Sequence, residues 1–325
     1  MPSKIFAVSI AFTLAASAQD TLYMSVLSSH AYRIGAQDNP IVGLFGSADG
    51  GNSWHHEGWI NYIRVFYTEA ASDGTLWSAC GNGVLRSTDA GASWKITTGW
   101  QITEALKVRA DNSDPSVVYA ATAYGIFKTT DHGATWKKKS RGLPGRFTAD
   151  VIIDEQNHAH LFAATEEGVY VSRDAGGHWM LCGLKGKGIR MLLQEQNNPQ
   201  TLWAGTEDDG LLKSENDGAT WKPMNNGLSA KTVYALASNP SDSRLLFAGT
   251  HGGGVFRSRD GGEHWTQQNN GLTNLVVHAL LVLPSHPQSV FAGTLNGGLF
   301  RSDDEGNSWK FVCQPEAQVW GLSVR

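Results

Sequence analysis

The sequence is poor in cysteine and has no long hydrophobic run. Its 325 residues include three cysteines, Cys80, Cys182 and Cys313, which lie far apart. An odd number of cysteines without close spacing predicts neither a disulfide framework nor a zinc site, so we expect three buried thiols. No stretch approaches about 18 consecutive apolar residues, and we therefore expect no membrane-spanning segment.

The sequence also lacks an excess of basic residues and the glycine motifs of cofactor-binding proteins. The formal net charge at pH 7 is −4, and lysines and arginines form no long run. Both features argue against nucleic acid as a partner. Neither a phosphate-binding glycine loop nor a His/Cys metal spacing is present, so we expect no cofactor and no metal.

Glycine, tryptophan and an eight-residue repeat are what the sequence has in quantity. It contains 37 glycines and 12 tryptophans, and the pattern Ser/Thr-x-Asp-x-Gly-x-x-Trp occurs seven times at steps of 40 to 44 residues, with Asn replacing Asp in the fifth copy. The residues at the Asp position are Asp49, Asp89, Asp131, Asp174, Asn216, Asp260 and Asp304. A fixed period in the low forties, filled with short apolar strands and turn residues, is typical of a β-propeller blade.

Each residue type in the repeat suits a tight turn between two strands. The aspartate can accept hydrogen bonds from backbone N–H groups just ahead of it. The glycine can adopt a positive φ, and the tryptophan can cover the turn with a large apolar face. The turn accounts for all seven residues at the Asp position, and we interpret them as structural.

The repeat resembles the Asp box, also called the bacterial-neuraminidase repeat, of sialidase-like propellers. The resemblance covers nearly the whole chain, and it implies an all-β, seven-bladed propeller with four-stranded blades. Similar propellers include sialidases, xyloglucan-cleaving glycoside hydrolases, sorting-receptor ectodomains and photosystem II assembly factors. The resemblance does not fix an activity, because one fold serves many functions.

The two ends of the chain predict how the ring closes. The first repeat begins with TLYMSVL (21–27), which aligns with the second strand of the other repeats, and the chain ends with VWGLSVR (319–325), which aligns with their innermost strand. We expect the C-terminal strand to complete blade one, which leaves no open sheet edge. Residues 19–325 would then form one propeller, which we expect to be monomeric.

Residues 1–18 have the pattern of a secretory signal peptide. They combine one lysine, an apolar run from Ile5 to Leu14 and the small residues Ala16-Ser17-Ala18. We expect cleavage after Ala18 and a secreted or periplasmic protein. The alternatives are an extra strand or a misplaced start codon.

The innermost strands predict a ligand-binding ring around the propeller axis, on the face opposite the Asp boxes. Two residues before a repeated Leu or equivalent, the repeats carry chemically varied side chains: Glu104, Ala149, Arg190, Tyr234, His278 and Trp320. In blade two Tyr67 or Thr68 is nearest to this position. Such a mixture suits a polar ligand held by a few directed contacts. The alternative is that these side chains only line a water-filled channel.

A second candidate surface lies in blade one. The segment SSHAYRIGAQDNP (28–40) replaces a short hairpin, and the nearby connection GWINYIR (58–64) is rich in aromatic residues. Tyr32, Arg33, Trp59 and Tyr62 would then share one sector of the rim, where aromatic faces with arginine suit either sugars or proteins. Alternatively, these residues pack on one another.

Two classes of function remain open at this point. The first is a non-catalytic binding or assembly module for a protein or a glycan. The second is a glycoside hydrolase, which needs two carboxylates beside the scissile bond. The candidate carboxylates are Glu104, Glu207, Asp208 and Asp209. The family enzymes differ from this chain: an arginine-isoleucine-proline string is here Arg33-Ile34-Gly35, and xyloglucan hydrolases of this type have two propellers.

Overall fold

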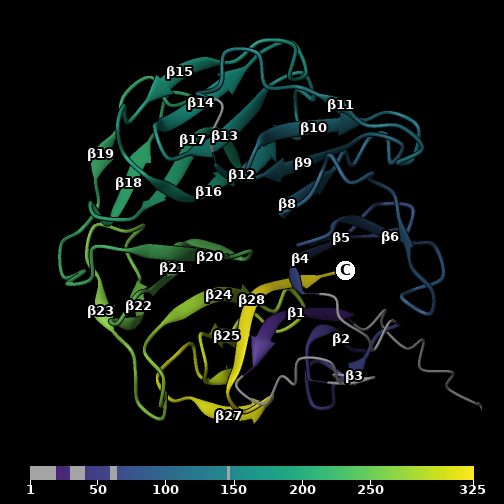
Figure 1. The fold of residues 1–325 in the computed structure, drawn as a ribbon. Coiled ribbons are helices and arrows are strands. Elements are labelled where there is room, and N and C mark those ends of the chain that lie inside the picture. Colours follow the sequence, from purple (N-terminus) through teal and green to yellow (C-terminus); the bar gives the residue numbers. More distant parts are fainter. Residues whose placement is uncertain (1–19, 30–40, 59–63, 145–146) are drawn as a thin grey trace, which may run out of the picture.

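The protein forms a ring of seven antiparallel sheets, each with four strands (Figure 1). We analysed a computed structural model, which describes residues 20–29, 41–58, 64–144 and 147–325. These residues contain strands, turns and bends but no helix. The predicted all-β, seven-bladed propeller with four-stranded blades is confirmed.

We number the blades from the one that contains the first strand, and give the strands of each blade from the axis outward. Blade 1 consists of β28 (Ala317–Val324), β1 (Leu22–Ser29), β2 (Gly43–Ser47) and β3 (His55–His56). Blade 2 consists of β4 (Val65–Ala70), β5 (Leu76–Cys80), β6 (Gly83–Ser87) and β7 (Lys95–Ile96). Blade 3 consists of β8 (Ala105–Ala110), β9 (Val118–Thr122), β10 (Gly125–Thr129) and β11 (Lys137–Lys138).

The other four blades repeat the same order. Blade 4 consists of β12 (Thr148–Ile153), β13 (Leu161–Thr165), β14 (Gly168–Ser172) and β15 (Met180–Gly183). Blade 5 consists of β16 (Ile189–Glu195), β17 (Asn198–Thr206), β18 (Leu211–Ser214) and β19 (Lys222–Pro223). Blade 6 consists of β20 (Val233–Asn239), β21 (Asp242–Thr250), β22 (Gly254–Ser258) and β23 (Thr266–Gln267). Blade 7 consists of β24 (Val277–Val282), β25 (Val290–Thr294), β26 (Gly298–Ser302) and β27 (Lys310–Cys313).

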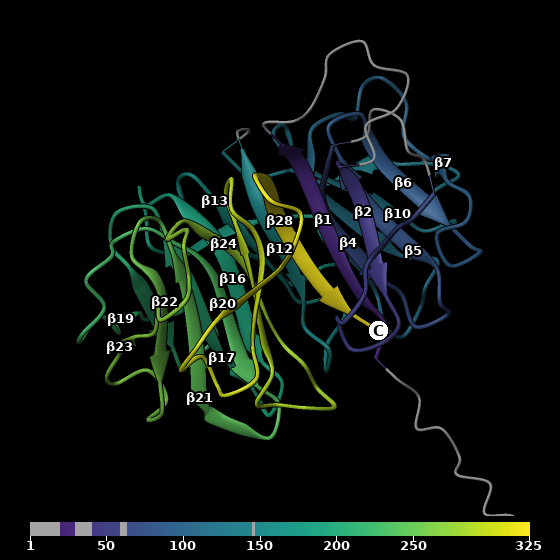
Figure 2. The same ribbon diagram turned by 90° about the horizontal axis from the view of Figure 1, so that it is seen from below.

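Blade 1 combines the two ends of the chain, as the sequence predicts. β28 pairs with β1 from Leu22 opposite Val324 to Ser29 opposite Ala317. Beyond the strands, the backbones of Thr21 and Arg325 exchange two hydrogen bonds of 3.2 and 2.9 Å. Figure 2 shows β28 beside β1. The ring is therefore closed by sheet pairing between segments nearly 300 residues apart.

The Asp-box turns lie between the third and fourth strands of the blades, and their side chains hold the turns as the residue types suggest. In the first box, the Asp49 carboxylate accepts hydrogen bonds from Ser53 N (2.9 Å), Ser53 Oγ (2.6 Å), Ser47 Oγ (2.8 Å) and Asn52 N (3.0 Å). These bonds, above all those from Ser53, lower the pKa of Asp49 from 3.8 to about 2. The box aspartates are therefore occupied by the turn.

Each box turn packs against the preceding blade, and two boxes show why it carries glycine. Gly262 has φ 92°, and a Cβ atom there would lie 2.5 Å from a ring carbon of Trp203 in the blade before it. Gly51 has φ 84°, and a Cβ atom there would lie 2.4 Å from the Phe291 ring. A side chain at either position would have to displace a buried aromatic ring. The hydrophobic core accordingly runs across blade junctions: one cluster joins Trp203 of blade 5 to Trp265 of blade 6.

Replacing Asp49 by alanine should destabilise the propeller, because the backbone N–H groups of the turn lose their acceptor. We expect the Tm to fall by about 2–4 °C at pH 7. Asp49→Asn should retain part of the stability, because Asn216 holds the fifth box through its Oδ1 atom. The depressed pKa makes the contribution of the ionised carboxylate present above pH 3.8, and it is lost as the pH falls through 2. The Tm difference between wild type and Asp49→Ala should therefore shrink as the pH falls toward 2, and a constant difference would contradict this account.

Ending the chain at Glu316 should abolish cooperative folding, because blade 1 loses its innermost strand and β1 gains an unpaired edge. Urea unfolding followed by circular dichroism measures this effect. A synthetic peptide of residues 317–325 added in trans should restore a cooperative transition. A truncated protein that melts like the full chain would show that β28 is not needed for closure.

Candidate functional site

The innermost strand of every blade has a β-bulge at the same position. In β20, for example, Val233 pairs with Thr250 and Ala235 pairs with Gly249, so Tyr234 has no partner in the ladder. The bulged residues of blades 1 to 7 are Trp320, Phe66, Leu106, Ala149, Arg190, Tyr234 and His278. A bulge re-aims a side chain, and bulges are frequent beside functional sites. These seven residues belong to the strands around the axis in Figure 1.

Five of the six residues predicted for this ring occupy the bulge: Ala149, Arg190, Tyr234, His278 and Trp320. Glu104 does not, because it lies exposed just before β8 with a left-handed φ of 50°. Leu106 takes the bulge position in blade 3. The sequence-based alignment took Leu106 as the repeated leucine of blade 3. The strand pairing instead aligns Val108 with Leu192, because each of them lies opposite an alanine twelve residues later.

Blade 2 contributes Phe66 at this position, between the strand residues Val65 and Tyr67. The sequence suggested Tyr67 or Thr68. The turn between β4 and β5 is shorter than in the other blades, since Thr68 pairs with Ser78 only ten residues later. The spacing of the other blades, counted back from Ser78, leads to residue 64 instead of Phe66, so spacing alone does not locate the bulge in this blade.

Four of the bulged rings, which we call the aromatic arc, contact one another across blades 6, 7, 1 and 2. Tyr234 stacks on His278 with ring centroids 4.1 Å apart, and His278 lies 4.5 Å from Trp320. Trp320 meets Phe66 edge to face at 5.5 Å. The Tyr234 and His278 rings therefore each cover one face of the other.

Two ring nitrogens of the arc have no hydrogen-bond partner among the described residues. They are Trp320 Nε1 and His278 Nε2, and both atoms are buried. Burial, with a smaller contribution from the charge of His251, lowers the pKa of His278 from 6.5 to about 4. His278 is therefore neutral at pH 7, and it can donate through one nitrogen and accept through the other.

Arg190 is the bulged residue of blade 5, next to Tyr234 of blade 6, and its side chain already has an ion-pair partner. Its guanidinium forms an ion pair with Glu207 of the β17–β18 loop and lies 5.7 Å from the centroid of the Phe147 ring. In the same loop Asp209 binds Lys187 at 2.7 Å. Two of the four candidate catalytic carboxylates, Glu207 and Asp209, thus form ion pairs. Glu104 and Asp208 are exposed and have no ion pair among the described residues.

A cluster of charged side chains on blades 2 to 4 was missed by sequence reasoning. Arg109 donates to Tyr67 Oη at 2.9 Å and to Glu69 Oε2 at 2.8 Å, and it lies 3.5 Å from Asp150. Lys107 Nζ sits 3.7 Å from the centroid of the Tyr67 ring. Burial lowers the pKa of Lys107 to about 8 and raises that of Tyr67 to about 12. The sequence feature that could have identified this cluster is the presence of ionisable residues on three adjacent innermost strands.

The remaining predicted residues lie elsewhere or outside the described part of the chain. Tyr32, Arg33, Trp59 and Tyr62, and the proposed signal peptide of residues 1–18, fall outside the described residues. The described residues contain no group of three or more His, Cys, Asp or Glu side chains that could hold a metal ion. Within the same ranges, no helix is long and apolar enough to cross a membrane.

Several solved structures of other proteins have a similar fold. The GH74 xyloglucanase from Xanthomonas campestris matches with a TM-score of 0.66 and 19% identity, over 87% of this chain and 51% of the enzyme. The extracellular domain of a hybrid two component system from B. thetaiotaomicron matches with a TM-score of 0.67 and 17% identity, over 86% and 38%. The chain is a seven-bladed β-propeller.

A third solved structure matches this propeller along most of both chains. It is YCF48 bound to D1 peptide, with a TM-score of 0.61 and 15% identity, over 88% of this chain and 90% of that one. By contrast, the propeller spans about half or less of the xyloglucanase and of the extracellular domain. No family model and no curated protein matches the chain. At these identities the likeness is one of fold.

Replacing His278 by phenylalanine should flatten the pH dependence of stability between pH 6.5 and 4. The unfolded chain binds a proton in this window that the folded chain does not, so stability is fully present above pH 6.5 and is lost as the pH falls through 4. Phenylalanine keeps a ring against Tyr234 and Trp320. Urea unfolding at pH 7, 5.5 and 4 measures the slope, with the exposed His55→Gln as control. An unchanged slope would assign the pH dependence to another group.

Proposed function

We propose that this propeller is a non-catalytic binding module that holds a polypeptide segment at the axial mouth, opposite the Asp boxes. The aromatic arc carries the proposal: it gathers four rings from four blades at one register, and the Arg190 guanidinium occupies the same register in the next blade. Peptide groups supply acceptors at short intervals, which suits a guanidinium donor. Aromatic side chains and arginine, here Arg190, are also frequent at protein interfaces.

A polypeptide suits this surface better than a glycan does. A sugar ring stacks on an open aromatic face, but Tyr234 and His278 each have one face covered by the other ring, with centroids 4.1 Å apart. The comparison with YCF48 supports the same proposal, because a propeller that this chain matches over 90% of its length was solved with a bound D1 peptide.

Glycoside hydrolysis is the second candidate, since GH74 xyloglucanases are among the proteins with this fold. The reaction needs one carboxylic acid and one carboxylate on either side of the glycosidic bond. Glu207 and Asp209 are engaged by Arg190 and Lys187, which favours a structural role for both. We also propose that the protein is exported, because residues 1–18 have the pattern of a signal peptide.

The test selects linear peptides from a random phage-displayed library on the mature protein, and incubates the same protein with a polysaccharide panel that includes xyloglucan. Selected peptides should bind at least 10-fold more weakly to Arg190→Ala and to Trp320→Phe, which removes the indole N–H but keeps a ring. Phe311→Ser is the matched control, because Phe311 is half exposed on the outer strand β27.

Each outcome decides between the candidates. Peptides whose affinity falls for both Arg190→Ala and Trp320→Phe, but not for the control Phe311→Ser, support the proposal, provided that the variants keep the wild-type Tm. Peptides that bind all variants equally would move the binding surface away from the arc. Release of reducing ends from a polysaccharide, lost in Glu207→Gln, would replace the proposal by glycoside hydrolysis.

A further inference from the structure

Two junctions between blades are bridged by an arginine from the third strand. Arg257 of β22 donates to Glu305 O at 2.7 Å and to Asn307 Oδ1 at 3.0 Å, both in the Asp box of blade 7. Arg301 of β26 makes the same pair of bonds in blade 1, to Gly50 O at 2.9 Å and to Asn52 Oδ1 at 3.0 Å. We call the residue just before the box serine or threonine the bridging position.

The acceptor at these junctions is the carbonyl of the fourth box residue, and other side chains reach it elsewhere. Tyr119 Oη donates to Ala175 O at 3.1 Å, and Cys182 Sγ contacts Asp217 O at 3.1 Å. Four of the seven junctions thus carry such a bond. Among the described residues, no side chain makes it at the junctions of blades 1 and 2, 2 and 3, or 5 and 6.

Lys213 occupies the bridging position of blade 5 but does not bridge. It lies between Trp203 and Lys222 in the sheet, as Arg301 lies between Phe291 and Lys310. Its Nζ pairs with Glu215 of its own blade at 3.1 Å. Arg301 makes the corresponding contact to Asp303 through Nε and still reaches the next blade through Nη1. The Lys213 ammonium makes only the contact within its blade, whereas the forked guanidinium of Arg301 makes both contacts through different nitrogens.

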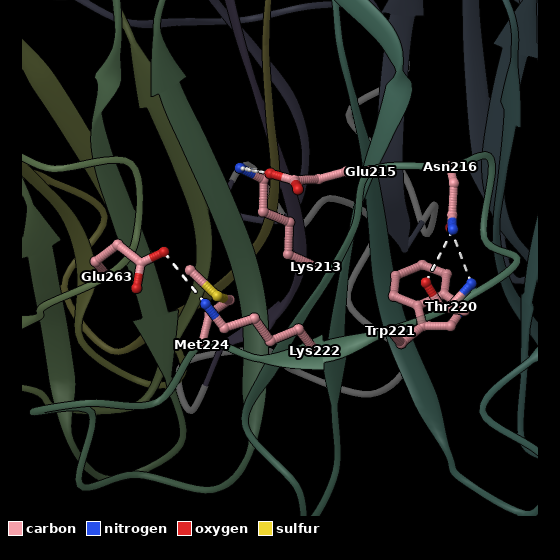
Figure 3. A pocket seen from close by; sticks show the side chains of 8 residues that line it. All are labelled: Lys213, Glu215, Asn216, Thr220, Trp221, Lys222, Met224 and Glu263. Atoms are coloured by element: carbon pink, nitrogen blue, oxygen red, sulfur yellow. Dashed lines mark hydrogen bonds and ion pairs between the residues drawn. The ribbon is translucent and has the colours of Figure 1, made fainter.

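A cleft of about 300 Å³ opens at the junction of blades 5 and 6 (Figure 3). Its lining residues are Lys213, Glu215, Asn216, Thr220, Trp221, Lys222, Met224 and Glu263. Glu263, from the box of blade 6, stands where the bridged boxes have Asn52 and Asn307, so a carboxylate replaces a neutral amide. It binds Lys222 at 3.4 Å, and both side chains are more than half exposed.

We propose that this cleft binds a guanidinium group, presented by an arginine side chain of a partner protein, at a junction that lacks a bridging arginine of its own. Of the acceptors that correspond to those of the bridged junctions, the Glu263 carboxylate lines the cleft. The charged groups that line the cleft are two lysines and two glutamates. Lys213 stays with Glu215, while Lys222 moves into solvent, which costs little because exposed ion pairs contribute at most about 1 kcal/mol.

The first experiment titrates butylguanidinium into protein labelled with ¹³C at its methionine methyl groups. The sequence has five methionines, and Met224 lines the cleft, so its methyl signal reports occupancy. Butylammonium is the control cation of equal charge and similar length. We expect a saturable shift of the Met224 signal with butylguanidinium and at least 5-fold weaker binding of butylammonium. Equal affinities, or a larger shift with sulfate, would overturn the assignment.

Three variants test the position of the site. Lys213→Arg supplies the bridging guanidinium from within, so it should abolish the Met224 shift and raise the Tm by about 2 °C. Glu263→Gln should weaken butylguanidinium binding about 3–10-fold. Arg257→Lys should leave the Met224 response unchanged. A Met224 shift that survives in Lys213→Arg would contradict the proposal, and none of these variants alters the axial mouth.

Discussion

The packing of each Asp-box turn against the preceding blade is the contact on which the ring depends. The box turn is rigid because its aspartate is saturated by the turn, and its glycine admits a buried aromatic ring from the neighbouring blade. The box tryptophan adds to this contact at several junctions: Trp265 Nε1 donates to Met224 O at 2.9 Å, and Trp309 Nε1 donates to Gln268 O at 2.9 Å. One short motif therefore sets both the turn within a blade and the approach of two blades.

This rigid frame leaves the innermost strands free to vary in chemistry. The bulge repeats in every blade, so seven side chains meet the axis at one level whatever their type. The framework therefore tolerates a phenylalanine, an arginine and a histidine at equivalent positions. Binding specificity in such a ring depends on which side chains the bulges carry rather than on backbone differences.

The sequence was sufficient for the fold because the signals were local and repeated. The box pattern, its period and the alignment of residues 319–325 with the other innermost strands predicted seven blades and their closure. The predicted alignment of blade 3 was wrong because Leu106 resembles the leucine that the other repeats carry. Only the strand pairing identifies Val108 as the equivalent of that repeated leucine. The cluster of Lys107 and Tyr67, and the cleft beside Lys213, depend on contacts between residues some 40 positions apart. No pattern within a single repeat encodes such contacts.

The pairing of β28 with β1 also sets the order in which the fold can be completed. β1 precedes every other strand of the ring in the chain, and β28 follows every other strand. Blades 2 to 7 are contiguous in the chain and can each assemble from local hairpins, whereas blade 1 has to wait until β28 has been made. Contacts of such long sequence separation are associated with slow folding. Closure of the ring is therefore a late step, during which the edge of β1 is exposed to other chains.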